Sequence, residues 1–166
     1  MRRFSLLTQI FVSIILVLCL SSATTKTKWK KYKNKKFGFS INFPKDYSSI
    51  ESADESGKTL SVQHFNEITN ELYFISVFNS EDYIDVNGLD DIAIQTFAEE
   101  VDGAILETRV LNSGRKEAII GIDATTFIFY QIKIDQDILY QIVCIHNSTN
   151  KTENILAYFD SFKLLK

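Results

Sequence analysis

The sequence has few residues of the types that form cross-links and tight turns. It contains two cysteines, one proline and six glycines among 166 residues. Cys19 lies in the apolar N-terminal segment, so Cys144 is the only cysteine of a chain that has lost this segment, and an intrachain disulfide is then excluded. Such a domain must be stabilised by its apolar core, and residues 37–166 are long enough to form one.

Groups that nucleophilic catalysis requires are also scarce. His64 and His146 are the only histidines, and the sequence contains no P-loop or dinucleotide-binding glycine pattern. Cys144 and His146 would share one face of a strand, so a Cys–His dyad is geometrically conceivable, but no glycine-rich oxyanion turn accompanies it. Because Cys144 lies in the apolar run Ile142–Ile145, we expect a buried core residue rather than a reactive thiol. The sequence predicts a protein that is not an enzyme and uses no cofactor.

An acidic stretch is the candidate metal site that the sequence offers. An EF-hand calcium loop needs acids at alternate positions and glycine at the sixth, but counting from Asp85 places Gly88 fourth and Leu89 fifth. We therefore interpret the stretch as solvated and helix-capping, and we expect no metal. Its residues are Glu81, Asp82, Asp85, Asn87, Asp90 and Asp91.

Residues 1–23 are typical of a secretory signal peptide. Arg2 and Arg3 precede the apolar run Ile10–Leu20, and small residues follow, which predicts cleavage after Ala23 and export to the periplasm or the extracellular space. An uncleaved membrane anchor is the alternative, because residues 4–23 could just span a bilayer and the lysines that follow favour a cytoplasmic location.

Charge is distributed unevenly along the chain. The net charge is −3, but from Phe37 onward there are nine basic and 21 acidic residues, a net charge of −12. An acidic domain is a poor candidate for nucleic-acid binding, because phosphate binding needs a basic face. We therefore expect no nucleic-acid partner.

Residues 24–36 carry seven lysines, and we expect a flexible basic arm, because like charges at this density cannot form a packed core. Lysines beside an anionic membrane favour binding, and Trp29 and Tyr32 suit a membrane interface or could pack on a sheet edge. The arm is thus predicted to dock onto an anionic membrane or a protein partner, with a plain linker as the alternative. The candidate docking residues are Lys26, Lys28, Trp29, Lys30, Lys31, Lys33, Lys35 and Lys36.

Two helices are predicted from apolar periodicity. Residues 87–103 repeat an apolar residue at every fourth position from Leu89 to Val101, with Asn87 as the expected N-cap and Gly103 just after the end. The second helix is predicted over Thr152–Ser161.

Alternating apolar residues predict a mainly antiparallel set of strands, with the segment KDYSS at residues 45–49 as a turn. Both faces of residues 126–130 are apolar or aromatic, so both sides of the sheet must be covered. This predicts an α+β fold, an α-β-α sandwich with one antiparallel sheet of about six to eight strands and helices on both faces. The predicted strands are Phe37–Phe43, Leu60–Phe65, Leu72–Phe78, Ile105–Leu111, Arg115–Ile120, Ala124–Ile134, Ile138–His146 and Phe162–Leu165.

Two segments carry a resemblance to a known family. YKNKKFGFSINFPKDYS resembles the opening of PsbP-like domains, and YQIVCIHN with the later ILAYFDSFKLL is similar to their ending. Residues 37–166 are thus identified as a domain of the superfamily that includes PsbP and the Ran-binding Mog proteins. The resemblance implies an α-β-α sandwich and docking to other molecules, and it implies no catalytic activity.

These observations predict an exported, non-enzymatic accessory module that docks to a membrane surface or a protein partner. The alternative is a carrier that holds a small hydrophobic ligand in a pocket between sheet and helix. Asn147 and Asn150 lie in glycosylation motifs, and these motifs mark an exposed loop.

Overall fold

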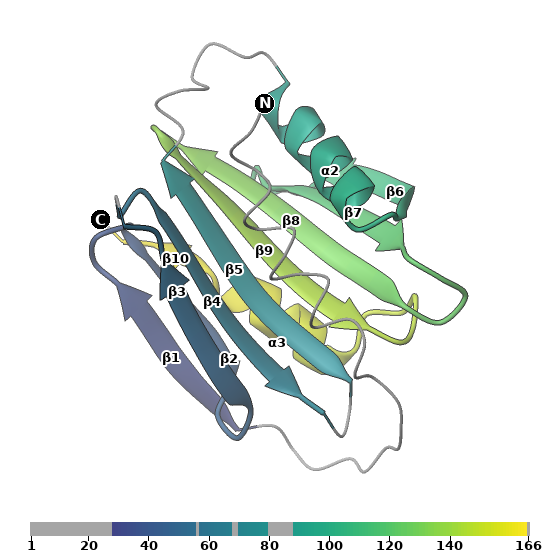
Figure 1. Ribbon diagram of the computed structural model, residues 1–166, viewed down its shortest axis with the longest axis horizontal. Helices are drawn as coiled ribbons and strands as arrows, with labels where there is room; N and C mark the ends of the chain where they lie inside the picture. The colour runs from purple at the N-terminus through teal and green to yellow at the C-terminus, as the bar shows by residue number, and fades with distance from the viewer. Residues whose placement is uncertain (1–27, 56, 68–69, 80–87, 166) are drawn as a thin grey trace.

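The structure is a computed structural model and describes residues 28–55, 57–67, 70–79 and 88–165. These residues form three layers (Figure 1). A seven-stranded antiparallel sheet is the middle layer, and helix α2 (Leu89–Glu100) packs on one face. Helix α3 (Glu153–Ser161) and a three-stranded sheet pack on the other face.

The strand order explains which segments meet. The seven-stranded sheet has the order β3-β4-β5-β9-β8-β7-β6, and the three-stranded sheet has the order β1-β2-β10. In the large sheet the strands are β3 (Ser48–Ala53), β4 (Thr59–Asn66), β5 (Glu71–Asn79), β6 (Ala104–Val110), β7 (Lys116–Gly121), β8 (Phe127–Asp135) and β9 (Ile138–His146). In the small sheet they are β1 (Trp29–Asn34), β2 (Phe39–Pro44) and β10 (Lys163–Leu164).

The central strands bury side chains on both faces. In β5, Tyr73 and Ile75 belong to the core beneath α3, whereas Leu72 and Phe74 belong to the core beneath α2. A sheet with two apolar faces needs cover on both, so the predicted α+β sandwich with helices on both faces is confirmed. Its seven strands fall within the predicted range, but a separate three-stranded sheet was not predicted.

The residues that cap α2 differ from the predicted ones. The helix begins after Gly88, which is its N-cap with a φ of 77°, and Asn87 lies outside the described residues. At the other end, Asp102 adopts the left-handed conformation with a φ of 53°, and the Gly103 N–H donates to the carbonyl of Ala98 at 2.8 Å.

Helix α3 follows its predicted bounds closely, is capped at its start and is anchored to the sheet by a buried tyrosine. Thr152 is its N-cap, and the Thr152 Oγ1 accepts a hydrogen bond from the Ile155 N–H at 3.3 Å. Tyr158 is fully buried and donates its hydroxyl to the Phe74 carbonyl of β5 at 2.7 Å. The hydrogen bond from Tyr158 holds α3 against β5.

The small sheet packs through one face of β2. Phe39, Ile41 and Phe43 are buried in the same core as α3, and the Tyr140 hydroxyl of β9 donates to the Phe37 carbonyl at 2.7 Å. The small sheet therefore covers the part of the large sheet that α3 leaves open.

The prediction that residues 24–36 form a flexible arm is wrong for Trp29–Asn34. These residues pair with β2, from Trp29 opposite Pro44 to Asn34 opposite Phe39, and Trp29 and Tyr32 pack against the core. Like charge did not prevent packing, because Trp29 and Tyr32 pack against the core while the lysines of the strand stay exposed. Lys26 and the predicted signal peptide lie outside the described residues.

The predicted turn at residues 45–49 is also wrong at its end. β3 begins at Ser48 and runs to Ala53, with Ser48 opposite Phe65 of β4. All six residues of β3 are exposed and only Ile50 is a large apolar residue, so β3 lacks the alternation that would have indicated a strand.

A buried ionic cluster joins the loop before α3 to β6, β7 and β8. The Glu117 side chain is 2% exposed and contacts Arg109 Nη2 at 2.8 Å, Gln131 Nε2 at 2.6 Å, and the ammonium of Lys151. Burial pushes the pKa of Glu117 up, but hydrogen bonds from Lys151 and Gln131 and the charge of Arg109 outweigh it and lower the pKa overall. The cluster therefore stabilises the fold while Glu117 is ionised.

We expect Lys151→Met to lower the free energy of unfolding by about 3 kcal/mol, because it removes a partner from a buried carboxylate. Urea denaturation at pH 7 measures this change. Since the folded pKa of Glu117 is lowered, the wild-type advantage is present at neutral pH and is lost as the pH falls below the ordinary carboxyl range. Lys163→Met is the matched control on the exposed surface, and an equal effect of both substitutions would contradict the role of the cluster.

A chain that begins at Lys28 should unfold cooperatively, whereas one that begins at Phe37 should lose about 3 kcal/mol of stability. The shorter chain lacks β1 and the apolar area that Trp29 and Tyr32 bury. Urea denaturation of both chains tests this, and equal stability would restore the view of β1 as a dispensable arm.

Candidate functional site

β1 is an edge strand, and the lysines in and beside it form a surface that we call the basic edge. Among the described residues, its lysines at positions 28, 30, 31, 33 and 35 make no ion pair. The Lys36 ammonium donates to the Gly57 carbonyl at 2.6 Å. The members of the basic edge are Lys28, Lys30, Lys31, Lys33, Lys35 and Lys36.

The pairing register divides these lysines between two faces. Lys31 lies opposite Asn42, and Lys33 lies opposite Ser40, which also pairs with Lys163 of β10. Opposite residues share a face, and this face points away from the core because the alternate residues of β2 are buried. Lys31, Lys33 and Lys163 therefore lie on the outer face of the small sheet. Analysis of the sequence missed Lys163, because only the strand order brings it beside β1.

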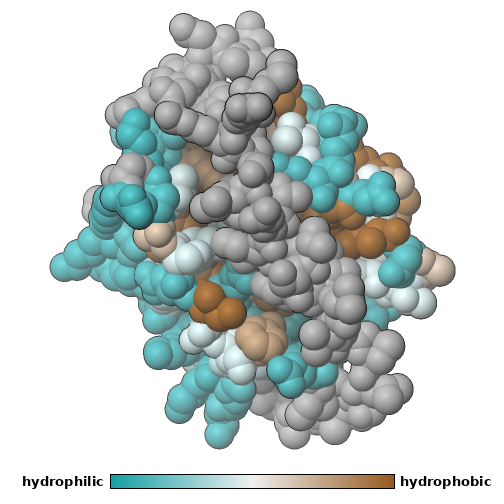
Figure 2. Space-filling view, viewed as in Figure 1, coloured by the Kyte–Doolittle hydropathy of each residue, from teal (hydrophilic) through white to brown (hydrophobic). Residues whose placement is uncertain are grey.

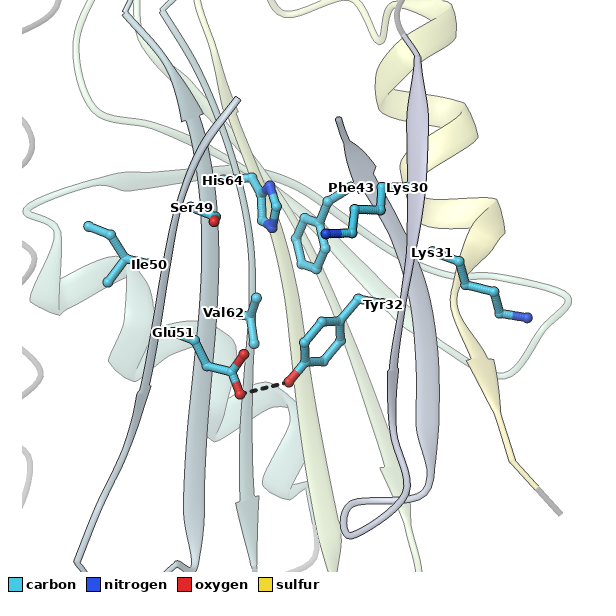
Figure 3. Close-up of a pocket in the computed structure, with 9 residues that line it drawn as sticks. All are labelled: Lys30, Lys31, Tyr32, Phe43, Ser49, Ile50, Glu51, Val62 and His64. Atoms are coloured by element: carbon cyan, nitrogen blue, oxygen red, sulfur yellow. Dashed lines mark hydrogen bonds between the residues drawn. The ribbon is translucent and has the colours of Figure 1, made fainter. Parts of the chain in front are cut away.

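The other face of β1 borders a hollow, which we call the intersheet cleft (Figure 3). It lies between β1 and β2 on one side and β3 and β4 on the other, with a volume of about 230 Å³. Its lining residues are Lys30, Lys31, Tyr32, Phe43, Ser49, Ile50, Glu51, Val62 and His64.

Two contacts shape the intersheet cleft. The ring of His64 stacks on that of Phe43, with centroids 4.2 Å apart and planes 11° apart. The Tyr32 hydroxyl donates to Glu51 Oε1 at 3.0 Å and so joins the small sheet to β3. In Figure 3 the side chain of Lys30 points toward the cleft, whereas that of Lys31 points away.

Burial makes His64 less basic. It lowers the pKa of His64, the charge of Lys30 acts in the same direction, and a hydrogen bond with the Pro44 carbonyl opposes both. The His64 Nδ1 is buried and has no hydrogen-bond partner among the described residues. The cleft thus combines the ammonium group of Lys30, the carboxylate of Glu51, an imidazole of lowered pKa and an aromatic wall. Its volume lies below the roughly 300–1,000 Å³ typical of pockets for drug-sized ligands.

The structure does not assemble the Cys–His dyad that strand periodicity made conceivable. Cys144 is fully buried, and burial raises the pKa of its thiol well above the ordinary value. His146 directs its Nε2 toward Glu71 Oε1, at 3.5 Å. A nucleophilic cysteine needs a lowered thiol pKa, so the environment of Cys144 opposes that chemistry.

The other predicted features are distributed as follows. Of the acidic stretch, Asp90 and Asp91 lie in the first turn of α2 and pair with Lys116, and residues 81–87 lie outside the described ranges. Asn147 and Asn150 are exposed, as the predicted loop requires.

Within the described ranges, no three His, Cys, Asp or Glu side chains gather as a metal site needs, and no helix is long and apolar enough to cross a membrane.

Comparison with solved structures identifies the fold. The solution structure of cyanobacterial PsbP (CyanoP) from Synechocystis sp. PCC 6803 matches with a TM-score of 0.55 and 11% identity, covering 87% of this chain and 96% of that one. A crystal structure from Bacteroides thetaiotaomicron VPI-5482 has a TM-score of 0.46 and 14% identity, covering 82% of this chain and 48% of that one. No protein-family model and no curated protein matches the chain. The chain has a PsbP-like fold, as the sequence resemblance predicted.

We expect the Cys144 thiol to react slowly with a thiol reagent in buffer and rapidly in denaturant, because it is buried and its pKa is raised. Labelling kinetics of a Cys19→Ser chain isolate this thiol. Rapid labelling of the folded chain would contradict the buried position and restore a reactive role.

Proposed function

We propose that the protein is an exported, non-enzymatic accessory module that docks onto an anionic membrane surface through its basic edge. The observation that carries the proposal is the set of five lysines without an ion pair among the described residues. The PsbP-like fold is consistent with an accessory module, and residues 1–23 support export.

The arrangement of charge favours one docking orientation. Residues 37–166 carry a net charge of −12, so an anionic surface would repel most of the domain. Lys31, Lys33 and Lys163 lie together on the outer face of the small sheet, and lysines near an anionic membrane contribute about 1 kcal/mol each. The small sheet would therefore face the membrane.

A structural explanation of the same lysines competes with docking. Lysines on edge strands prevent pairing with another chain, and both β1 and β10 are edge strands. However, Lys35 lies in the turn between β1 and β2, where it protects no strand edge. Its presence supports a surface that extends beyond the strand.

The alternative of a hydrophobic carrier has less support. The carrier was predicted to hold its ligand between sheet and helix, whereas the cleft lies between the two sheets and has a volume of about 230 Å³. Its lining includes Lys30 and Glu51, which are costly beside an apolar ligand.

Replacing Lys31, Lys33 and Lys163 by glutamine should weaken binding of the chain from Thr24 onward to phosphatidylserine vesicles by about 100-fold, the equivalent of about 3 kcal/mol. Vesicle co-sedimentation measures this affinity. The matched control replaces Lys45, Lys58 and Lys133, which changes the net charge equally outside β1 and β10. Binding should also weaken as salt rises, because exposed charges are screened.

Two outcomes would reject membrane docking. The first is equal binding to neutral phosphatidylcholine vesicles, or binding that survives both the substitutions and high salt. The second is no binding to anionic vesicles, which would leave a protein partner as the target of the basic edge.

A further inference from the structure

β6 forms the far edge of the large sheet, and it exposes apolar side chains. All seven residues of β6 are exposed, including Ile105, Leu106 and Val110, which are 36%, 56% and 72% exposed. Ile92 of the neighbouring α2 is 47% exposed. Figure 2 shows apolar side chains gathered on the right of the molecule, where Figure 1 places β6 and α2. An unpaired strand edge with apolar side chains is a site for pairing with another strand.

The sequence of β6 is complementary to itself. If two copies pair antiparallel with Thr108 facing Thr108, Leu106 of each copy lies opposite Val110 of the other. In the same register, Glu107 of each copy lies opposite Arg109 of the other. Opposite charges and apolar pairs stabilise facing strands, and identical two-fold contacts are what a closed dimer requires.

The faces of β6 agree with this register. Glu107 and Arg109 lie opposite Ile119 and Glu117 of β7, on the α3 face of the sheet. Thr108 and Val110 project from the α2 face. A β-bulge between Ile105 and Glu107 contains Leu106. Glu107–Val110 is therefore the regular pairing segment, and the contact of Leu106 with Val110 lies at its border with the bulge.

The structure holds Arg109 in place for this contact. Its guanidinium donates from Nε and Nη2 to the buried Glu117 carboxylate at 2.9 and 2.8 Å, whereas Nη1 lies 3.9 Å from Glu107 of the same chain. The Arg109 side chain remains 54% exposed. Because Glu117 fixes the guanidinium, less conformational entropy is lost when Arg109 binds a second carboxylate.

Two of the other edge strands, β1 and β3, lack this complementarity. β1 carries lysines as its charged residues, so two copies of β1 would place like charges together. β3 carries Glu51 as its single charged residue, so no register of β3 against itself pairs opposite charges.

We infer that β6 is a self-association surface, on which a second copy of this chain pairs antiparallel about Thr108 and extends the large sheet across a two-fold axis. The inference is independent of membrane docking, since β6 and β1 lie on opposite sides of the molecule (Figure 1). One strand pair buries less area than a permanent dimer needs, so the dimer is weak and depends on protein concentration.

The inference is tested by cross-linking at Thr108 in the 166-residue chain with Cys19→Ser. Facing residues of an antiparallel pair have Cα atoms about 4.5–5.5 Å apart, within the range of a disulfide. Thr108→Cys should therefore form a disulfide-linked dimer under mild oxidation. Ser52→Cys, exposed on the edge strand β3, is the matched control and should form at least about tenfold less dimer.

Two further substitutions in the Thr108→Cys chain separate specific pairing from random collision. Glu107→Lys places a lysine opposite Arg109 of the second copy, and Val110→Lys removes an apolar pair, so each should reduce the cross-linked fraction at least about tenfold. Circular dichroism checks that each variant remains folded. Equal cross-linking of Thr108→Cys and Ser52→Cys, or cross-linking that neither lysine substitution reduces, would overturn the inference.

Discussion

The architecture depends on the two apolar faces of the central strands β5 and β9. Tyr73, Ile75 and Cys144 enter one core and Phe74 and Val143 enter the other, so neither face can remain in water. Of the described elements, helix α2 covers one face. On the other, α3 covers only part of the sheet, and β2 brings the small sheet over the rest. The position of β1, and with it the basic edge and the intersheet cleft, follows from this need for cover.

Much of the fold could be predicted because apolar periodicity marks buried elements. The strands from β4 to β9 and both helices were placed near their observed bounds, and all of these elements except β6 have a buried face. β1 and β3 were missed for the opposite reason. In β1 only Trp29 and Tyr32 are apolar, and β3 has one large apolar residue. Such strands form because a neighbouring strand hydrogen-bonds to them, and this pairing cannot be recognised from the local sequence.

The sequence predicted the residues of the candidate site only as a group, and the structure describes where those from Lys28 onward lie. The lysines of residues 28–36 were predicted as a group, and the pairing with β2 decides which of them face outward and adds Lys163. The intersheet cleft could not be predicted, because His64 meets Phe43 only when two sheets stack. The edge strands also differ in charge. Two copies of β1 would place lysines beside one another, whereas two copies of β6 would pair Glu107 with Arg109. The fold thus has one edge that disfavours pairing with a second copy and one that favours it.

The pairing of β2 with β10 has a consequence for how the protein is made. Phe39 and Ser40 of β2 pair with Leu164 and Lys163 of β10, more than 120 residues later in the chain. In the same way, the second edge of β5 is paired only when β9 is present. Contacts so distant in sequence form slowly. A ribosome synthesises the chain from its N terminus, so the small sheet cannot close until Lys163 and Leu164 have been made. Until then the sheet lacks its third strand, and β2 has one unpaired edge.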